Sequence, residues 1–142
     1  WDPYVQGTIF GITRGTENGH IARAALESIA LRTRDIVIEM EKDAGIKFKD
    51  LKVDGGASNN NLLMQIQANL LSTNVIRPKT TETTALGVAY LAGLATGFWK
   101  DISDLKKLWI EDMCFHPDTT FKSNDIIELW KNRINRLLKV NE

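Results

Sequence analysis

The longest regular pattern of apolar positions lies between residues 20 and 42 and predicts an α-helix. Its apolar side chains form two neighbouring stripes and therefore a broad arc, which favours a helix that presses on a sheet and is covered again beside it. One stripe consists of Ile21, Ala25, Ile29, Ile36 and Met40, and the other of Leu26, Ala30, Thr33 and Val37. Gly45 is a suitable residue to end this helix.

Shorter apolar runs predict the remaining elements. Strands are predicted at Thr8–Thr13 with a bulge or close approach at Gly11, at Leu51–Val53, at Asn74–Arg77 before Pro78, and at Trp109–Phe115. Helices are predicted from Asn59 or Asn60 to Leu71, from Ala85 to Thr96 with Thr83 or Thr84 as the cap, from Asp101 to Leu108, and from Phe121 to Val140. This alternation predicts an α/β layered domain.

A glycine turn follows the strand at Leu51–Val53. The run Asp54-Gly55-Gly56 ends that strand, and the asparagines Asn59, Asn60 and Asn61 precede a helix. A strand, a glycine turn and a helix N-terminus together can direct backbone N–H groups at phosphate oxygens. The alternative is a tight strand-to-helix turn in which an asparagine merely caps the helix. Ligands of α/β sheets bind beyond the carboxyl ends of strands, where this turn lies.

The helix predicted at Ala85–Thr96 is rich in small residues. Gly87 and Gly93 each cost about 1 kcal/mol relative to alanine in a helix interior. Tight packing against a neighbouring element is the simplest reason for accepting that cost, and we expect Phe98 and Trp99 to be buried at the end of this helix. Gly97 is expected in a left-handed conformation.

Composition and charge limit the ligands that the protein is expected to bind and the compartment in which it is expected to lie. The chain has 142 residues, and its 18 Lys and Arg residues balance 18 Asp and Glu residues, which argues against general affinity for nucleic acid or anionic membranes. We expect no membrane span and no signal peptide. A single cysteine, Cys114, excludes an internal disulfide and favours a cytoplasmic protein. With only His20 and His116 available, a zinc site is not expected.

Common catalytic motifs are absent from the sequence. There is no P-loop, no G-x-G-x-x-G fingerprint and no G-x-S-x-G elbow, and His20 and His116 have no nearby Ser or Cys arrangement that suggests a nucleophile and base. The acidic residues of the first helical region are expected to form its solvated face; they are Glu17, Glu27, Asp35 and Glu39. A nucleotide-binding surface without a catalytic base is what one half of a two-lobed enzyme would present.

The first residues, Trp1-Asp2-Pro3-Tyr4, are unusually aromatic for a free terminus. We expect that the chain was cut from a larger protein, although an arm that folds back on its own core is the alternative. A chain of this kind is expected to expose surface that its parent buries and therefore to self-associate as a homo-oligomer.

Four motifs in order resemble the family of carbohydrate kinases with paired actin-like lobes. They are Gly7–Gly15, the pattern from His20 to Glu27, Val53–Ala57 with Asn60 and Leu63–Gln67, and Thr84–Gly93. The resemblance is clear from Trp1 to about Trp99, weak to Phe115, and thin beyond it. The segment His116–Thr120 lacks the particular acidic residue that some members carry there for a regulatory contact. The resemblance implies a ribonuclease H-like (actin-like ATPase) α/β lobe with a mixed sheet flanked by helices, a C-terminal nucleotide-binding lobe over residues 1–115 and a helical extension over residues 116–142.

The resemblance also implies a reaction. Members of the family transfer the γ-phosphoryl group of ATP to an alcohol with Mg²⁺, and the Trp-Asp-Pro-Tyr start and Thr13–Gly15 favour glycerol as that alcohol. The alternatives are a kinase for another polyol or sugar, or a non-enzymatic actin-like module. Gly56 and Asn60 match nucleotide-contacting positions of the family, and Gly55 shapes the same turn. No catalytic residue carries over, because the aspartate base and the alcohol site are expected upstream of Trp1.

Overall fold

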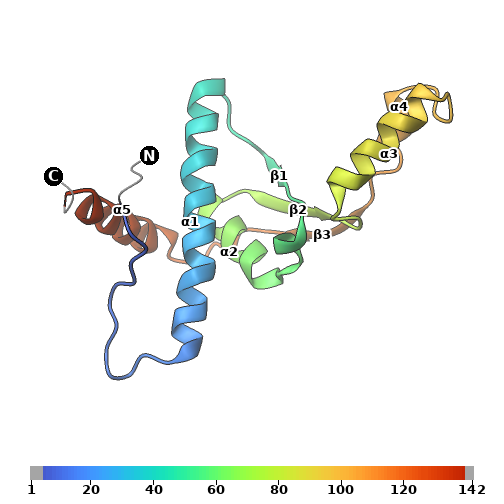
Figure 1. Cartoon of the computed structure of the whole chain (residues 1–142). Coiled ribbons are helices and arrows are strands. Elements are labelled where there is room, and N and C mark those ends of the chain that lie inside the picture. Colours follow the sequence, from blue (N-terminus) through green and yellow to red (C-terminus); the bar gives the residue numbers. More distant parts are fainter. Residues whose placement is uncertain (1–4, 140–142) are drawn as a thin grey trace.

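The computed structural model describes residues 5–139, in which a small sheet lies beside one long helix (Figure 1). In this part of the chain a three-stranded mixed sheet has the order β1-β2-β3. β1 (Asp50–Lys52) runs parallel to β2 (Asn74–Pro78), and β3 (Glu111–Phe115) pairs antiparallel with β2 on its other side. The mixed sheet flanked by helices agrees with the predicted fold class.

The helix α2 (Asn61–Leu71) lies between the sheet and the long helix α1 (Asn18–Ala44). Ile66 of α2 is 2% exposed and Val75 of β2 is fully buried. The side-chain amide of Gln67 is also buried and donates a hydrogen bond of 3.2 Å to the carbonyl oxygen of Ala30 in α1. The core also contains Leu31, Leu63, Met64, Ala68, Leu70 and Phe115. The main core therefore surrounds α2, and α1 packs against this helix.

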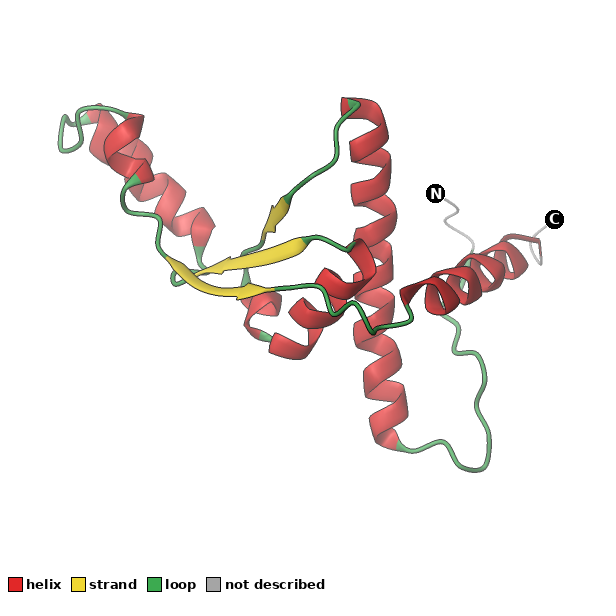
Figure 2. Cartoon of the chain, turned by 180° about the vertical axis from the view of Figure 1, so that it is seen from behind, coloured by secondary structure: helices red, strands yellow, loops and turns green. Residues whose placement is uncertain are grey.

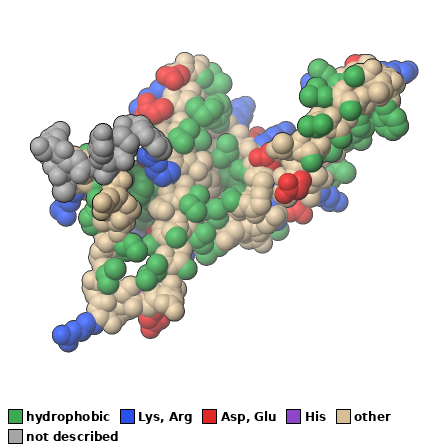
Figure 3. All heavy atoms as spheres, in the orientation of Figure 1, with side chains coloured by type: hydrophobic (Ala, Val, Ile, Leu, Met, Phe, Trp, Pro, Cys, Tyr) green, Lys and Arg blue, Asp and Glu red, His purple; other side chains and the backbone are tan. Residues whose placement is uncertain are grey.

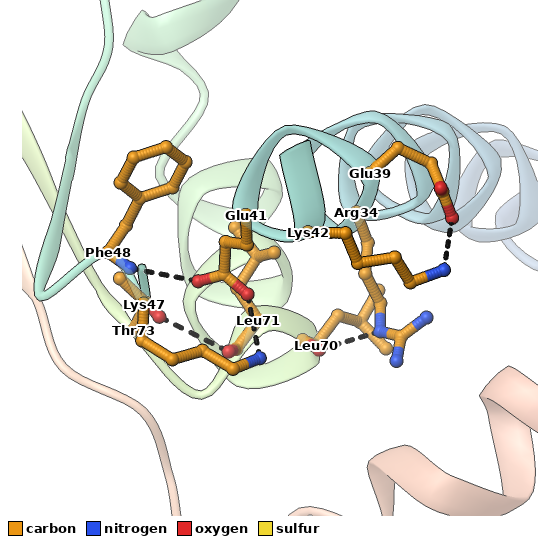
Figure 4. A network of polar contacts seen from close by, with 9 residues as sticks. All are labelled: Arg34, Glu39, Glu41, Lys42, Lys47, Phe48, Leu70, Leu71 and Thr73. Atoms are coloured by element: carbon orange, nitrogen blue, oxygen red, sulfur yellow. Dashed lines mark hydrogen bonds and ion pairs between the residues drawn. The ribbon is translucent and has the colours of Figure 1, made fainter. Parts of the chain in front are cut away.

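A polar network joins the end of α1 to the chain that follows it (Figure 4). The carboxylate of Glu41 accepts hydrogen bonds from the Lys47 ammonium at 2.8 Å and from the Phe48 backbone N–H at 2.9 Å. These two contacts hold the pKa of Glu41 below its usual value. Arg34 donates from Nε to the carbonyl oxygen of Leu70 at 3.2 Å and so ties α1 to the last turn of α2. Gly45 ends α1 with φ of 67°, as the sequence predicts.

The helix α5 (Ser123–Lys139) lies on the other side of α1 from the sheet (Figures 1 and 2). Three of its apolar side chains, Ile126, Ile127 and Trp130, pack against the main core. The Trp130 indole N–H donates a hydrogen bond of 2.9 Å to Asp35 of α1. Of the helix predicted at Phe121–Val140, Ser123–Lys139 is helical, and Val140 lies outside the described residues.

The strand predicted at Thr8–Thr13 is wrong, because the structure places this segment in an irregular loop. A strand needs a neighbouring chain with which to form its hydrogen bonds. This segment lies beside α5 and away from the sheet, where the Arg133 guanidinium is 5.5 Å from the centre of the Phe10 ring. Gly11 has a positive φ of 83°, but the expected close backbone approach is absent within the described residues, because an added Cβ atom would make only an ordinary contact of 3.7 Å with the Arg133 side chain.

The arm formed by α3 (Thr83–Ala95) and α4 (Ile102–Lys106) projects away from the core (Figure 1). No residue of α3 is buried in the described structure, and a side chain at Gly87 would meet no neighbouring atom. The tight packing predicted for Gly87 is therefore absent, whereas Gly93 is covered closely by the Trp99 ring. Phe98 is 78% exposed, so its predicted burial is wrong. Gly97 has the expected left-handed conformation, with φ of 76°.

Two expectations about α1 and α3 also need correction. The α1 stripe of Ile21, Ile29, Ile36 and Met40 is exposed, because α2 covers only the neighbouring stripe that contains Ala30 and Val37. Glu82 precedes the first residue of α3 without a side-chain cap, and Thr83 itself begins the helix. The expectations about Trp1 and Tyr4 lie outside the described residues.

Candidate functional site

The glycine turn lies at the carboxyl ends of the two parallel strands β1 and β2. After β1 the backbone N–H of Val53 still bonds to the Ile76 carbonyl oxygen at 3.1 Å, and two residues later Gly55 donates to the Thr81 carbonyl oxygen at 2.8 Å. The Thr83 hydroxyl at the start of α3 donates a hydrogen bond to the Asp54 carboxylate. The turn is thus fixed to the chain segment that leads from β2 into α3.

Gly55 has a backbone conformation that essentially only glycine adopts. Its φ is 77° and its ψ is 169°, a combination in which a Cβ atom would clash with the residue's own backbone. The Gly55 carbonyl oxygen accepts hydrogen bonds from the Ser58 backbone N–H at 3.1 Å and from the Ser58 hydroxyl at 2.7 Å. Ser58 is 1% exposed. Gly55 is therefore required by the shape of the turn.

Gly56 is different, because neither its backbone nor its surroundings require glycine. Its φ lies outside the left-handed region, and a Cβ atom built on it would have no neighbour within 4 Å. Gly56 begins a short 3₁₀ helix, η1 (Gly56–Asn59), and its backbone N–H has no acceptor within residues 5–139. The exposed Gly56 backbone therefore leaves room for a ligand to approach it directly.

Asn60 caps the helix α2. Its side-chain oxygen accepts a hydrogen bond of 3.0 Å from the Leu63 backbone N–H, as the capping alternative predicts. The side chain is exposed, and its amide nitrogen has no hydrogen-bond acceptor in the described part of the chain. Asn60 can therefore cap α2 with its oxygen and donate to a ligand with its nitrogen.

Arg77 of β2 is a buried arginine that the sequence analysis did not single out. Its guanidinium donates to the Ser58 carbonyl oxygen at 2.9 Å and to the Asn61 side-chain oxygen at 2.8 Å, and it pairs with Asp112 of β3 at 2.7 Å. An arginine directly after the apolar pair Val75-Ile76 in a predicted strand was the available signal. Arg77 therefore connects the glycine turn with two strands.

Other titratable side chains make structural contacts. Glu27 pairs with Arg23, Glu39 pairs with Lys42, and Glu17 caps α1 together with His20. Burial, reinforced by the carboxylates of Glu111 and Asp50, raises the pKa of the Cys114 thiol, so this thiol is protonated at neutral pH. Residues 5–139 contain no group of three or more His, Cys, Asp or Glu side chains that could hold a metal ion.

The mixed sheet, the helix α2 packed on it and the glycine turn at the strand ends define a lobe with the actin-like ATPase fold. Residues 1–96 match the profile described as "FGGY family of carbohydrate kinases, C-terminal domain", and the chain belongs to this family. The four motifs found in the sequence therefore identify the family correctly.

Its relatives include several curated glycerol kinases. The chain is 54% identical over 143 aligned residues to the glycerol kinase of Alkaliphilus oremlandii, and this alignment covers 100% of the chain and 28% of the relative. It is 51% identical over 137 residues to the glycerol kinase of Deinococcus radiodurans, which covers 96% of the chain and 27% of that relative. The chain thus spans little more than a quarter of the length of these relatives.

Solved structures with the same fold include other kinases of the family. A crystal structure of Plasmodium falciparum glycerol kinase with ADP aligns with a TM-score of 0.83 and 33% identity, over 97% of this chain and 28% of that one. A ligand-bound xylulose kinase from Lactobacillus acidophilus aligns with a TM-score of 0.81 and 23% identity, over 97% of this chain and 28% of that one. The second comparison supports the fold alone.

Proposed function

We propose that this chain is the ATP-binding part of a glycerol kinase, which transfers the γ-phosphoryl group of ATP to glycerol and forms glycerol 3-phosphate. The observation that carries the proposal is Gly56, whose exposed backbone and empty surroundings suit the close approach of a nucleotide. Identities of 51% and 54% to curated glycerol kinases, and the structural similarity to a glycerol kinase solved with ADP, support the same choice.

The chain's part in the reaction is to bind and orient the nucleotide. Gly56 offers its backbone to ATP or ADP, Gly55 shapes the turn that presents it, and the Asn60 amide nitrogen donates to the nucleoside end. Phosphoryl transfer depends chiefly on positioning and on neutralising the phosphate charge. Mg²⁺ would be held chiefly by the phosphate oxygens, and the proposal assigns no metal ligand and no catalytic base to this chain. Glycerol binds through residues outside it.

We also propose a division of the chain into two parts and a cellular location for the protein. Residues 1–115 form the nucleotide-binding lobe, and residues 116–142 form a helical extension whose α5 side chains pack on the core. Among the described helices, none is long and apolar enough to span a lipid bilayer. We place the protein in the cytoplasm because its single cysteine suits a reducing compartment.

A kinase for another polyol or sugar is the second candidate. The xylulose kinase from Lactobacillus acidophilus has nearly the same TM-score as the glycerol kinase structure, so the fold does not distinguish these substrates. Sequence identity does favour glycerol, because the glycerol kinase structure is 33% identical and the xylulose kinase is 23% identical.

The deciding experiment uses a chimera in which this chain replaces the matching stretch of the Alkaliphilus oremlandii glycerol kinase. We expect the chimera to release ADP from ATP and Mg²⁺ only when glycerol is added. The 142-residue chain alone is expected to show no glycerol-dependent turnover in the same coupled assay. A folded chimera that is inactive with glycerol and ATP would contradict the proposal that this chain binds the nucleotide. Turnover by the chain alone, at the rate of a complete kinase, would refute the assignment of roles.

The Asn60→Ala substitution in the chimera is expected to raise KM for ATP by about two- to tenfold, because one polar contact contributes roughly 0.5–1.5 kcal/mol. KM for glycerol should change less. Asn60→Ser is the matched control, since serine also caps helices but lacks the amide nitrogen. If the amide contacts the nucleotide, both variants raise KM for ATP. An effect of the alanine variant alone would assign Asn60 to capping only.

A further inference from the structure

The guanidinium of Arg77 is the main side-chain anchor of the 3₁₀ turn that follows Gly55. The Arg77 side chain is only 9% exposed. One of its terminal nitrogens donates both to the Ser58 carbonyl oxygen at 2.9 Å and to the Asn61 side chain at 2.8 Å. Ser58 belongs to η1 and Asn61 is the first residue of α2, so the two bonds fix both ends of the segment between them.

The opposite side of the guanidinium is held by β3. Its Nε donates to Asp112 at 2.8 Å, the other terminal nitrogen lies 2.7 Å from the same carboxylate oxygen, and the Phe115 ring centre is 5.5 Å away. A buried arginine that is paired on one side cannot turn to another partner without leaving a charge unsatisfied. The planar fork therefore holds the turn at a fixed distance from the two strands.

We propose that Arg77 is a positioning residue that keeps the Gly55–Asn61 segment in the conformation that binds the nucleotide. The role of the segment in nucleotide binding rests on the proposed function, whereas the ordering of the segment by Arg77 rests on the hydrogen bonds alone. Arg77 itself lies beneath the turn and is buried, so it acts through Ser58 and Asn61 and not by touching a ligand exposed to solvent.

Hydrogen exchange on the 142-residue chain tests the ordering of the segment. In the Arg77→Met variant the hydrogen-bonded amides of Gly55, Ser58 and Asn60 should exchange at least about tenfold faster than in the unsubstituted chain, with the amides of α1 as the internal reference. Arg77→Lys keeps a charge for Asp112 but lacks the planar fork, so it should give a smaller increase. Arg34→Met is the matched control, because Arg34 also donates to one carbonyl oxygen but at the other end of α2 (Figure 4).

Kinetics of the chimera test the link to the nucleotide. Arg77→Met should raise KM for ATP by about tenfold or more and change KM for glycerol by less than about twofold, whereas Arg34→Met should leave both nearly unchanged. Asn61→Ala, which removes one acceptor at an exposed position, covers the case in which Arg77→Met fails to fold, and it should give a smaller rise in KM for ATP.

The outcomes separate this inference from the proposed function. An unsubstituted chimera without glycerol kinase activity contradicts the proposed function, and the exchange rates then decide alone whether Arg77 orders the segment. An active chimera whose Arg77 and Asn61 variants keep the KM for ATP of the Arg34 control overturns the inference. Equal acceleration of exchange in the segment and in α1 also overturns it, because that result indicates a general loss of stability.

Discussion

The Gly56→Val substitution is expected to remove ATP-dependent activity from the chimera without weakening the fold. Gly56 has an ordinary φ, and a side chain there would meet only open space in the chain itself. A branched side chain would, however, occupy the space through which the nucleotide approaches the backbone. We expect kcat/KM for ATP to fall by at least about 100-fold, which corresponds to about 2.7 kcal/mol, and the urea midpoint of the chain to stay unchanged.

Gly55→Val provides the contrast at the neighbouring residue. Valine cannot adopt φ of 77° with ψ of 169° without strain of about 1–3 kcal/mol. This variant should therefore lower both the urea midpoint and the activity. If Gly56→Val lowers the midpoint as much as Gly55→Val does, glycine at position 56 serves folding. If Gly56→Val leaves KM for ATP unchanged, the nucleotide does not approach this residue.

Elements that depend on neighbours close in sequence could be predicted well. The helix α2 begins after Asn60 and ends at Leu71 as its pattern indicates, because its cap and its apolar face are local features. Gly45 and Gly97 likewise have the left-handed conformation that ends a helix. Of the candidate site, the glycine turn and its place after β1 could be predicted, because a strand followed by two glycines already specifies them.

Features that depend on distant contacts could not be predicted. The apolar run at Thr8–Thr13 has the composition of a strand, but the described chain offers it no neighbouring strand. The role of Arg77 depends on Asp112, which is 35 residues away in sequence. The sequence predicts close packing at Gly87 and burial of Phe98, but the described structure shows neither. Which part of a helix is covered depends on the elements that pack beside it.

The uncovered surface of the chain is unusually large. Its accessible area is 10463 Å², whereas a compact monomer of 16.0 kDa exposes about 7,400 Å². Part of the excess is apolar: on α1 the side chains of Ile29, Ile36 and Met40 are 50–57% exposed, and on α3 Val88 and Leu91 are 66% and 70% exposed. Figure 3 shows hydrophobic side chains at the surface along α1 and over the α3–α4 arm. Such patches on soluble proteins usually contact another polypeptide.

The 142-residue chain alone is therefore expected to self-associate at micromolar concentrations, through the exposed stripe of α1. The double variant Ile29→Glu and Ile36→Lys should shift the chain toward the monomer in sedimentation and light-scattering measurements. It keeps the net charge at zero, and both new residues favour helix formation more than isoleucine does, so α1 itself should persist.

The matched control exchanges charges on exposed positions of the same helix through Arg32→Glu and Glu39→Lys. This variant leaves the apolar stripe intact and should associate as strongly as the unsubstituted chain. If the stripe is the contact, the chimera should also lose this association, because the rest of a kinase then covers α1. An unsubstituted chain that stays monomeric at tens of micromolar would contradict the expectation of self-association. Equal association of both double variants would place the contact outside the α1 stripe. The α3–α4 arm would then be the remaining large apolar surface.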